Sequence, residues 1–132
     1  MPVTWSIEGD LLRMNFEGRY EPPEIIEQFE AALADPRCPE EVSLLVDATK
    51  SESLDKRSPT EIRYVAEYLG PYRKRIRGRC AVVASGNLQF GLSRMGSVYS
   101  ENVGVDAQVF RSVPEALKWL RIGEPTRKEP GR

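Results

Sequence analysis

Two short apolar runs in this sequence are each followed by polar side chains that could bind a ligand or carry a modification. The first run, residues 43–48 (SLLVDA), contains Asp47 and is followed by Thr49. The second run, residues 80–84 (CAVVA), is followed by a turn of three small residues, Ser85, Gly86 and Asn87. Such runs are typical of parallel strands covered on both faces. Ligands often bind where these strands end and helices begin, because backbone N–H groups converge there.

We expect a candidate ligand site where the loops after these two runs meet. The helix expected after the second run has apolar residues at helical spacing, with Gly91 and Gly96 between them. The candidate site consists of Asp47, Ser85, Gly86, Asn87, Gly91 and Arg94. It would suit a small anionic or acyl, lipid-like ligand. The alternative interpretation is that the two glycines permit close packing of helices.

The residue types give little support to catalysis. The chain has no histidine, which removes Ser–His and Cys–His nucleophile pairs, imidazole metal sites and the usual general base. The common phosphate-binding, dinucleotide-binding, metalloprotease and hydrolase motifs do not occur in the sequence. Cys38 and Cys80 form no metal-type pair and are expected to be free thiols. We therefore predict a protein that is not an enzyme and that uses no cofactor or metal.

The composition is that of one globular domain. The 132 residues are enough to bury a single core without disulfides, and no apolar run approaches the ~20 residues that a membrane-spanning helix needs. The first residues show no basic segment followed by an apolar one, so a secretory signal is not expected. The sequence predicts a cytoplasmic protein with no transmembrane segment.

The net charge of −1 hides an uneven distribution. Residues 1–61 hold 14 acidic and 6 basic side chains, whereas residues 62–132 hold 6 acidic and 13 basic ones. The basic half could attract a polyanion, or the two halves could neutralise each other within the fold or across a dimer. We favour neutralisation, because a nearly neutral chain attracts nucleic acid only weakly. Nucleic acid is therefore not an expected partner.

The first half of the chain predicts a hairpin and a helix. Alternating apolar residues indicate strands at 4–7 and 11–17. A helix is predicted from Pro22 to about Ala34, because two prolines fix its first turn and an apolar stripe follows. The polar residues 49–57 are interpreted as a surface loop.

A second helix is signalled by a capping box. Ser58 precedes Pro59, which suits the first helical position, and Glu61 stands three residues after the cap. A separate line of three tyrosines spaced four apart runs along this helix and beyond it: Tyr64, Tyr68 and Tyr72. They either shield the core beside the helix or form a partner surface, since tyrosine is enriched at interfaces.

The remaining elements complete an α/β domain. After the strand at 80–84 and its helix, we predict a strand at 106–111 and a last helix that begins with a second capping box at Ser112. The order predicts a single domain over residues 1–122, with four helices on a five-stranded mixed, mostly parallel sheet that includes the N-terminal antiparallel hairpin. Residues 123–132 are charged and contain prolines, so we expect a disordered tail.

The chain also resembles a known family. The segments VVASG and FGLSRM, the VDAT that ends the earlier strand, and the closing VFRSVPEALKWL are similar to those of the SpoIIAA-like group of STAS-type domains. These small bacterial proteins are related in fold to anti-sigma-factor antagonists and to Sec14-like lipid carriers. The resemblance covers residues 3–121 and implies a STAS/Sec14-like fold with a regulatory role.

The resemblance further implies a modification site. In anti-sigma-factor antagonists an aspartate, one further residue and a phosphorylated serine or threonine follow this strand, and Asp47, Ala48 and Thr49 match that order. Lys50 stands where the family has glycine, and several polar residues separate Thr49 from the next helix, where the family has none. Thr49 is thus a candidate phosphoacceptor. Alternatively, its hydroxyl and the Asp47 carboxylate only stabilise a turn.

Two functions from different classes are predicted. The first is a non-enzymatic regulatory or protein-interaction domain, whose partner is another protein or a second copy in a homodimer. The alternative is a small-ligand carrier that binds an anionic or acyl ligand at the C-terminal ends of the strands. The resemblance and the missing catalytic groups support the first function. The expected helix starts, the glycines and Arg94 support the second.

Overall fold

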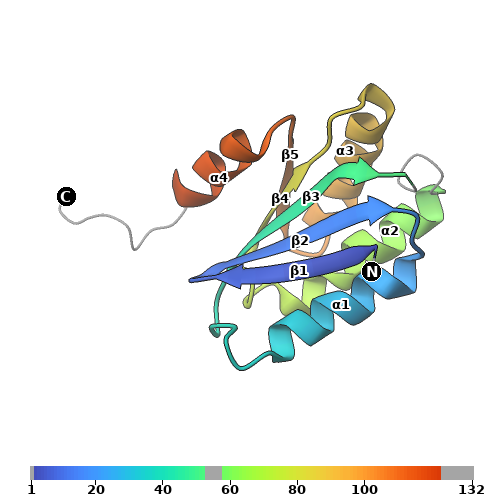
Figure 1. The fold of residues 1–132 in the computed structure, drawn as a ribbon. Helices are drawn as coiled ribbons and strands as arrows, with labels where there is room; N and C mark the ends of the chain where they lie inside the picture. The colour runs from blue at the N-terminus through green and yellow to red at the C-terminus, as the bar shows by residue number, and fades with distance from the viewer. Residues whose placement is uncertain (1, 53–57, 123–132) are drawn as a thin grey trace.

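A five-stranded sheet forms the centre of the molecule (Figure 1). The computed structural model describes residues 2–52 and 58–122. The strands are β1 (Val3–Glu8), β2 (Leu11–Gly18), β3 (Ser43–Ser51), β4 (Arg79–Val83) and β5 (Asp106–Phe110). The helices are α1 (Pro22–Ala34), α2 (Pro59–Tyr68), α3 (Asn87–Glu101) and α4 (Val113–Ile122), and a 3₁₀ turn, η2 (Gly70–Tyr72), follows α2. The predicted α/β fold is confirmed, and the predicted tail at 123–132 lies outside the described residues.

The strands lie in the sheet in the order in which they occur in the chain. β1 and β2 form the predicted antiparallel hairpin, whose two-residue turn requires the positive φ of Gly9. The pairs β2–β3, β3–β4 and β4–β5 are all parallel. The connections between parallel strands are right-handed. Because each strand lies next to the strand that follows it in the chain, all the connecting helices lie on the same face of the sheet. Figure 1 shows α1, α2 and α3 on that face and α4 on the opposite one.

β3 is longer than the sequence predicted. The surface loop expected from Thr49 onward is wrong for its first residues, because β3 continues to Ser51. After Asp47 the register between β2 and β3 shifts, with one extra residue in β3, and Lys50 then pairs with Glu17 and Ser51 with Gly18. Residues 53–57 of the predicted loop lie outside the described residues.

The alternation of side chains along β3 and β4 gives each face its own core. Leu44 and Cys80 belong to the apolar cluster on the face of α1, α2 and α3. Leu45 and Ala81 belong to the cluster beneath α4. The two apolar runs are therefore covered on both faces, as their sequence predicted, except where β3 extends beyond α4.

Helix α2 packs closely against α3. The two helices approach at Gly96, where an added Cβ atom would lie 3.3 Å from Ile62 Cγ2. One turn further along, the Ser100 hydroxyl donates a hydrogen bond of 3.4 Å to the Ala66 carbonyl. The predicted capping box fixes the first turn of α2. In the described part of the chain, no helix combines the length and the apolar character needed to cross a bilayer.

On its other side, α2 reaches α1 through tyrosine side chains. The hydroxyls of Tyr68 and Tyr72 both donate to the Glu30 carboxylate on α1. The ring of Tyr72 also meets the ring of Phe29 edge-on, with centroids 5.3 Å apart. Tyr64 lies apart from this cluster, with 55% of its surface exposed. The three tyrosines therefore do not act as one line: two of them connect helices, and the third faces solvent.

The basic segment before β4 meets the acidic half of the chain. Arg77 forms an ion pair with Asp10, with Nη1 and Oδ2 3.2 Å apart. Arg75 donates hydrogen bonds to the carbonyls of Leu33 and Pro39. The ion pair of Arg77 supports the interpretation that the two halves neutralise each other within the fold, while the Arg75 hydrogen bonds hold the basic segment against the first half.

A matched pair of glycines on α3 tests the packing of α2. Replacing Gly91 by Gln should raise the free energy of unfolding by about 0.5 kcal/mol, because glutamine is the better helix former and an added Cβ there meets nothing within 4 Å. Gly96→Gln should lower it by about 1–3 kcal/mol, because its side chain would collide with Ile62. Urea unfolding measures both. Equal effects at the two positions would contradict the close α2–α3 contact.

Candidate functional site

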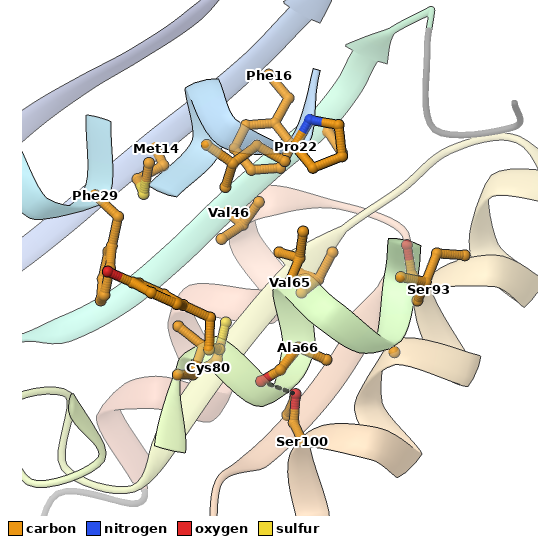
Figure 2. A pocket seen from close by; sticks show the side chains of 18 of the residues that line it. Met14, Phe16, Pro22, Phe29, Val46, Val65, Ala66, Cys80, Ser93 and Ser100 are labelled. Atoms are coloured by element: carbon orange, nitrogen blue, oxygen red, sulfur yellow. Dashed lines mark hydrogen bonds between the residues drawn. The ribbon is translucent and has the colours of Figure 1, made fainter. Parts of the chain in front are cut away.

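An apolar cavity lies between the sheet and the helices α1, α2 and α3 (Figure 2). Its volume is about 150 Å³, and it is partly open to solvent. Strands β2, β3, β4 and β5 form its floor, and α2 forms its roof together with parts of α1 and α3. Side chains that line it include Met14, Phe16, Phe29, Val46, Val65, Leu69, Val82 and Leu92.

Small side chains in the wall explain why the space is hollow. Ala48, Cys80 and Ala107 lie on the floor, while Ala66 and Gly96 lie on the helices above it. Protein interiors are normally packed without voids larger than a water molecule. An enclosed cavity of 150 Å³ would cost about 3–4 kcal/mol of packing free energy at about 24 cal/mol per Å³, and this is the upper limit for the partly open space here. A ligand that fills the cavity would regain packing free energy through its contacts with the apolar walls.

The sulfur of Cys80 contributes to this wall (Figure 2). Burial raises the pKa of the Cys80 thiol to about 12, so it is uncharged at neutral pH. A thiol in this state is a poor nucleophile. In this position Cys80 acts as a small apolar side chain.

A second, polar depression lies on the opposite face of the sheet, over β1, β2 and β3. It is lined by Ser6, Glu8, Arg13, Asn15, Phe16, Glu17, Asp47, Thr49 and Lys50. At its centre Arg13 Nη2 lies 2.7 Å from Asp47 Oδ2. The Thr49 hydroxyl and the Thr49 backbone N–H both donate to Asp47 Oδ1, over 2.7 and 3.0 Å. The interpretation of Asp47 and Thr49 as a locally hydrogen-bonded pair is confirmed, although the pair lies in a strand and not in a turn.

The surroundings of Asp47 stabilise its charged form. Burial alone would raise the pKa of the carboxyl group, but the hydrogen bonds from Thr49 and the Arg13 guanidinium outweigh burial. The net result is a pKa below the ordinary value of 3.8. Asp47 is therefore an ionised, fully engaged side chain at neutral pH.

The other residues of the predicted ligand site lie away from both hollows. The Ser85 carbonyl and the Asn87 side chain accept hydrogen bonds from Arg111, each over 3.1 Å. Gly91 and Arg94 are exposed on α3. A ligand site formed by these residues between the two loops stays a prediction. β3 continues beyond Asp47, so Asp47 faces the polar depression instead.

Helix α3 begins without a side-chain cap from Asn87. Asparagine is a favoured cap residue, but Gly86 occupies the cap position and Asn87 is the first helical residue. The Gln89 side chain accepts the Gly86 N–H over 3.4 Å and donates to the Ser51 carbonyl over 3.0 Å. Gln89 thereby ties the beginning of α3 to the end of β3. Ligand binding by this turn stays a prediction.

Sequence reasoning identified residues of the cavity wall without recognising the cavity. Ile62, Val65 and Leu69 recur at helical spacing in the sequence, and all three line the cavity, from α2 and from the residue that ends it. The signal that could have found the hollow is the row of small residues on α3 at positions i, i+3, i+4 and i+7, which lie on one helix face: Ser93, Gly96, Ser97 and Ser100. This row places little side-chain volume where a core helix normally presents leucine or isoleucine.

Comparison with known proteins gives no match: no protein-family model, no curated protein and no solved structure matches this chain. The resemblance to STAS-type domains therefore stays a prediction. Within residues 2–52 and 58–122, no group of three or more His, Cys, Asp and Glu side chains is arranged to hold a metal ion.

Changing Asp47 to Asn should remove an acid-dependent part of the stability. Because folding lowers the Asp47 pKa, the carboxylate stabilises the fold above pH 3.8, and this contribution is lost as the pH falls through the lower pKa of the folded state. We expect Asp47→Asn to cost about 1–2 kcal/mol at pH 7 and almost nothing well below pH 3.8. Urea unfolding between pH 2 and pH 7 measures the difference. Glu17→Gln, which removes the same charge from the same face, should cost less than 0.5 kcal/mol throughout.

Proposed function

We propose that this chain is a non-enzymatic binding domain that holds a small apolar ligand in the cavity beneath α2. The observation that carries the proposal is the cavity itself, which has a volume of about 150 Å³ and mostly hydrocarbon walls. Apolar cavities of about 150 Å³ stay dry in water and take up molecules of the size of benzene. A well-formed apolar cavity with a few polar groups at its edge is the usual place for a small ligand to bind in a protein.

The packing of α2 supports reversible binding. α2 has its main contacts with α3 and α1, and the cavity lies between it and the strands below. A ligand in this space would replace the missing contacts between helix and sheet. It would bind the folded chain and not the unfolded one, so it must raise the stability of the fold.

This proposal keeps the acyl, lipid-like part of the ligand-carrier hypothesis and changes its location. The hypothesis placed the ligand among polar groups at the C-terminal ends of the strands, near Ser85 and Arg94. The cavity beneath α2 offers apolar surface instead, at the middle of the sheet. The ligand proposed here is therefore bound mainly by burial of its hydrocarbon part, which contributes about 25 cal/mol per Å² of apolar surface.

Filling the cavity with a protein side chain tests the proposal. Val82 lies on the cavity floor at the centre of β4, so Val82→Phe should occupy the space that a ligand needs. Benzene at 100 times its dissociation constant should stabilise the unchanged protein by about 2.7 kcal/mol, seen as a rise in the melting temperature. Benzene binding to Val82→Phe should be at least tenfold weaker.

Two further variants serve as controls for this experiment. Val98→Phe makes the same change on α3 at a side chain that is 58% exposed, and it should leave benzene binding unaltered. Val46→Phe fills the cavity from β3 and replaces Val82→Phe if that variant does not fold. Benzene that fails to raise the melting temperature of the unchanged protein, or that binds all variants equally, would sink the proposal.

A second candidate function is the regulatory role implied by the STAS resemblance. The specific observation in its favour is that Thr49 and Asp47 lie on the part of the sheet that α4 does not cover. A phosphate on the Thr49 hydroxyl would bring about two negative charges next to the Asp47 carboxylate and the Arg13 guanidinium. Such a change would alter the charge of an accessible face and so its choice of protein partner. A cytoplasmic location and pairing with another protein or a second copy belong to this proposal.

Peptide mapping by mass spectrometry tests the regulatory role. The protein isolated from its native host should carry phosphate on Thr49. In the Thr49→Val variant, the peptide that contains position 49 should carry no phosphate. Thr49→Glu should also change the set of proteins, or the number of copies, that associate with the chain. A Thr49 that is unmodified under all growth conditions would exclude phosphorylation as the switch.

A further inference from the structure

The cavity beneath α2 has no partner for a charged ligand. Among the described residues that line it there is no lysine or arginine. Its one carboxylate, that of Glu61, already accepts a hydrogen bond of 2.9 Å from the backbone N–H of Ser58. An ionised carboxylate or phosphate placed here would lose its hydration without gaining a counter-charge, which costs several kcal/mol. The anionic ligand considered from the sequence is therefore disfavoured at this site.

The polar groups in the wall are mainly the hydroxyls of three serines on α3. Ser97 donates to the carbonyl of Arg94 over 2.7 Å, and Ser100 donates to the carbonyl of Ala66 over 3.4 Å. The Ser93 hydroxyl is the exception: within the described part of the chain, no residue forms a hydrogen bond with it. Figure 2 shows Ser93 and Ser100 at two different parts of the wall.

Volume limits the body of the ligand. About 150 Å³ suits one six-membered ring or a chain of about six carbon atoms, and it is too small for a whole phospholipid or a long acyl chain. The walls of this space are aliphatic and aromatic side chains from the sheet and three helices. Size and lining together select a small hydrocarbon body.

We infer that the cavity beneath α2 binds an uncharged, benzene-sized molecule with one hydroxyl group, which the Ser93 hydroxyl holds by a hydrogen bond. Phenols and short-chain alcohols have this chemistry. The inference rests on the proposed function, because it assigns a ligand class to the same cavity. It makes Ser93 the residue that distinguishes a hydroxylated ligand from a plain hydrocarbon of the same size.

Four probes and two serine variants test the inference. Benzene and phenol differ by one hydroxyl group, and benzyl alcohol and benzoate differ mainly in charge. Isothermal titration of each probe into the full chain measures affinity. Ser93→Ala should weaken phenol binding about threefold to tenfold and leave benzene binding unchanged, because only the hydrogen bond is lost. Benzoate should bind at least tenfold more weakly than benzyl alcohol.

Ser97→Ala is the matched control, since it removes another hydroxyl from the same wall that is already bonded to a carbonyl. It should leave the affinity for phenol, relative to benzene, unaltered. Benzoate binding as tightly as benzyl alcohol, or equal effects of Ser93→Ala and Ser97→Ala on phenol, would overturn the ligand class while benzene binding still supported the cavity. Benzene that does not bind, or that binds Val82→Phe equally well, would instead overturn the proposed function.

Discussion

The order of strands in the sheet is the constraint on which the rest of this structure depends. Because neighbouring strands are also consecutive in the chain, each right-handed crossover brings its helix to the same face. Three helices must then share the width of four parallel strands. α1 and α3 take the flanks, and α2 is left above the middle, resting on its two neighbours. The cavity follows from this arrangement, because α2 carries Ala66 and faces Ala48, Cys80 and Ala107 below it.

The same constraint leaves the other face of the sheet short of helices. Of the helices in the described residues, only α4 returns to that face, and its apolar side chains cover Leu45, Ala81 and Val83. Beyond Leu11, which packs against the cluster beneath α4, β1, β2 and the end of β3 receive no helix there among the described residues, and polar side chains line the depression on this face. Asp47 and Thr49 therefore face outward from a central strand, where an apolar residue would otherwise be expected. The Arg13 guanidinium compensates the charge of Asp47.

Much of the fold could be predicted from local patterns. The hairpin, the two capping boxes, the apolar runs and the change of period between strands and helices are properties of neighbouring residues, and they fixed the element types. The boundaries that failed depend on distant partners. β3 extends through Lys50 and Ser51 because β2 pairs with it, and the Asn87 side chain at the start of α3 accepts a hydrogen bond from Arg111. Patterns of neighbouring residues cannot show either of these distant partners, β2 or Arg111.

The candidate sites divide in the same way. The sequence by itself determined the element order, the absence of histidine, the Asp47 and Thr49 pair, and the inner face of α2, because each depends on residue type and short spacing. Only the tertiary structure decided that Asp47 lies on the opposite face from the cavity, and that five small residues from five elements enclose one space. The reason is that a cavity forms when side chains from segments far apart in the chain together fail to fill the space between them. No single segment of the sequence shows this.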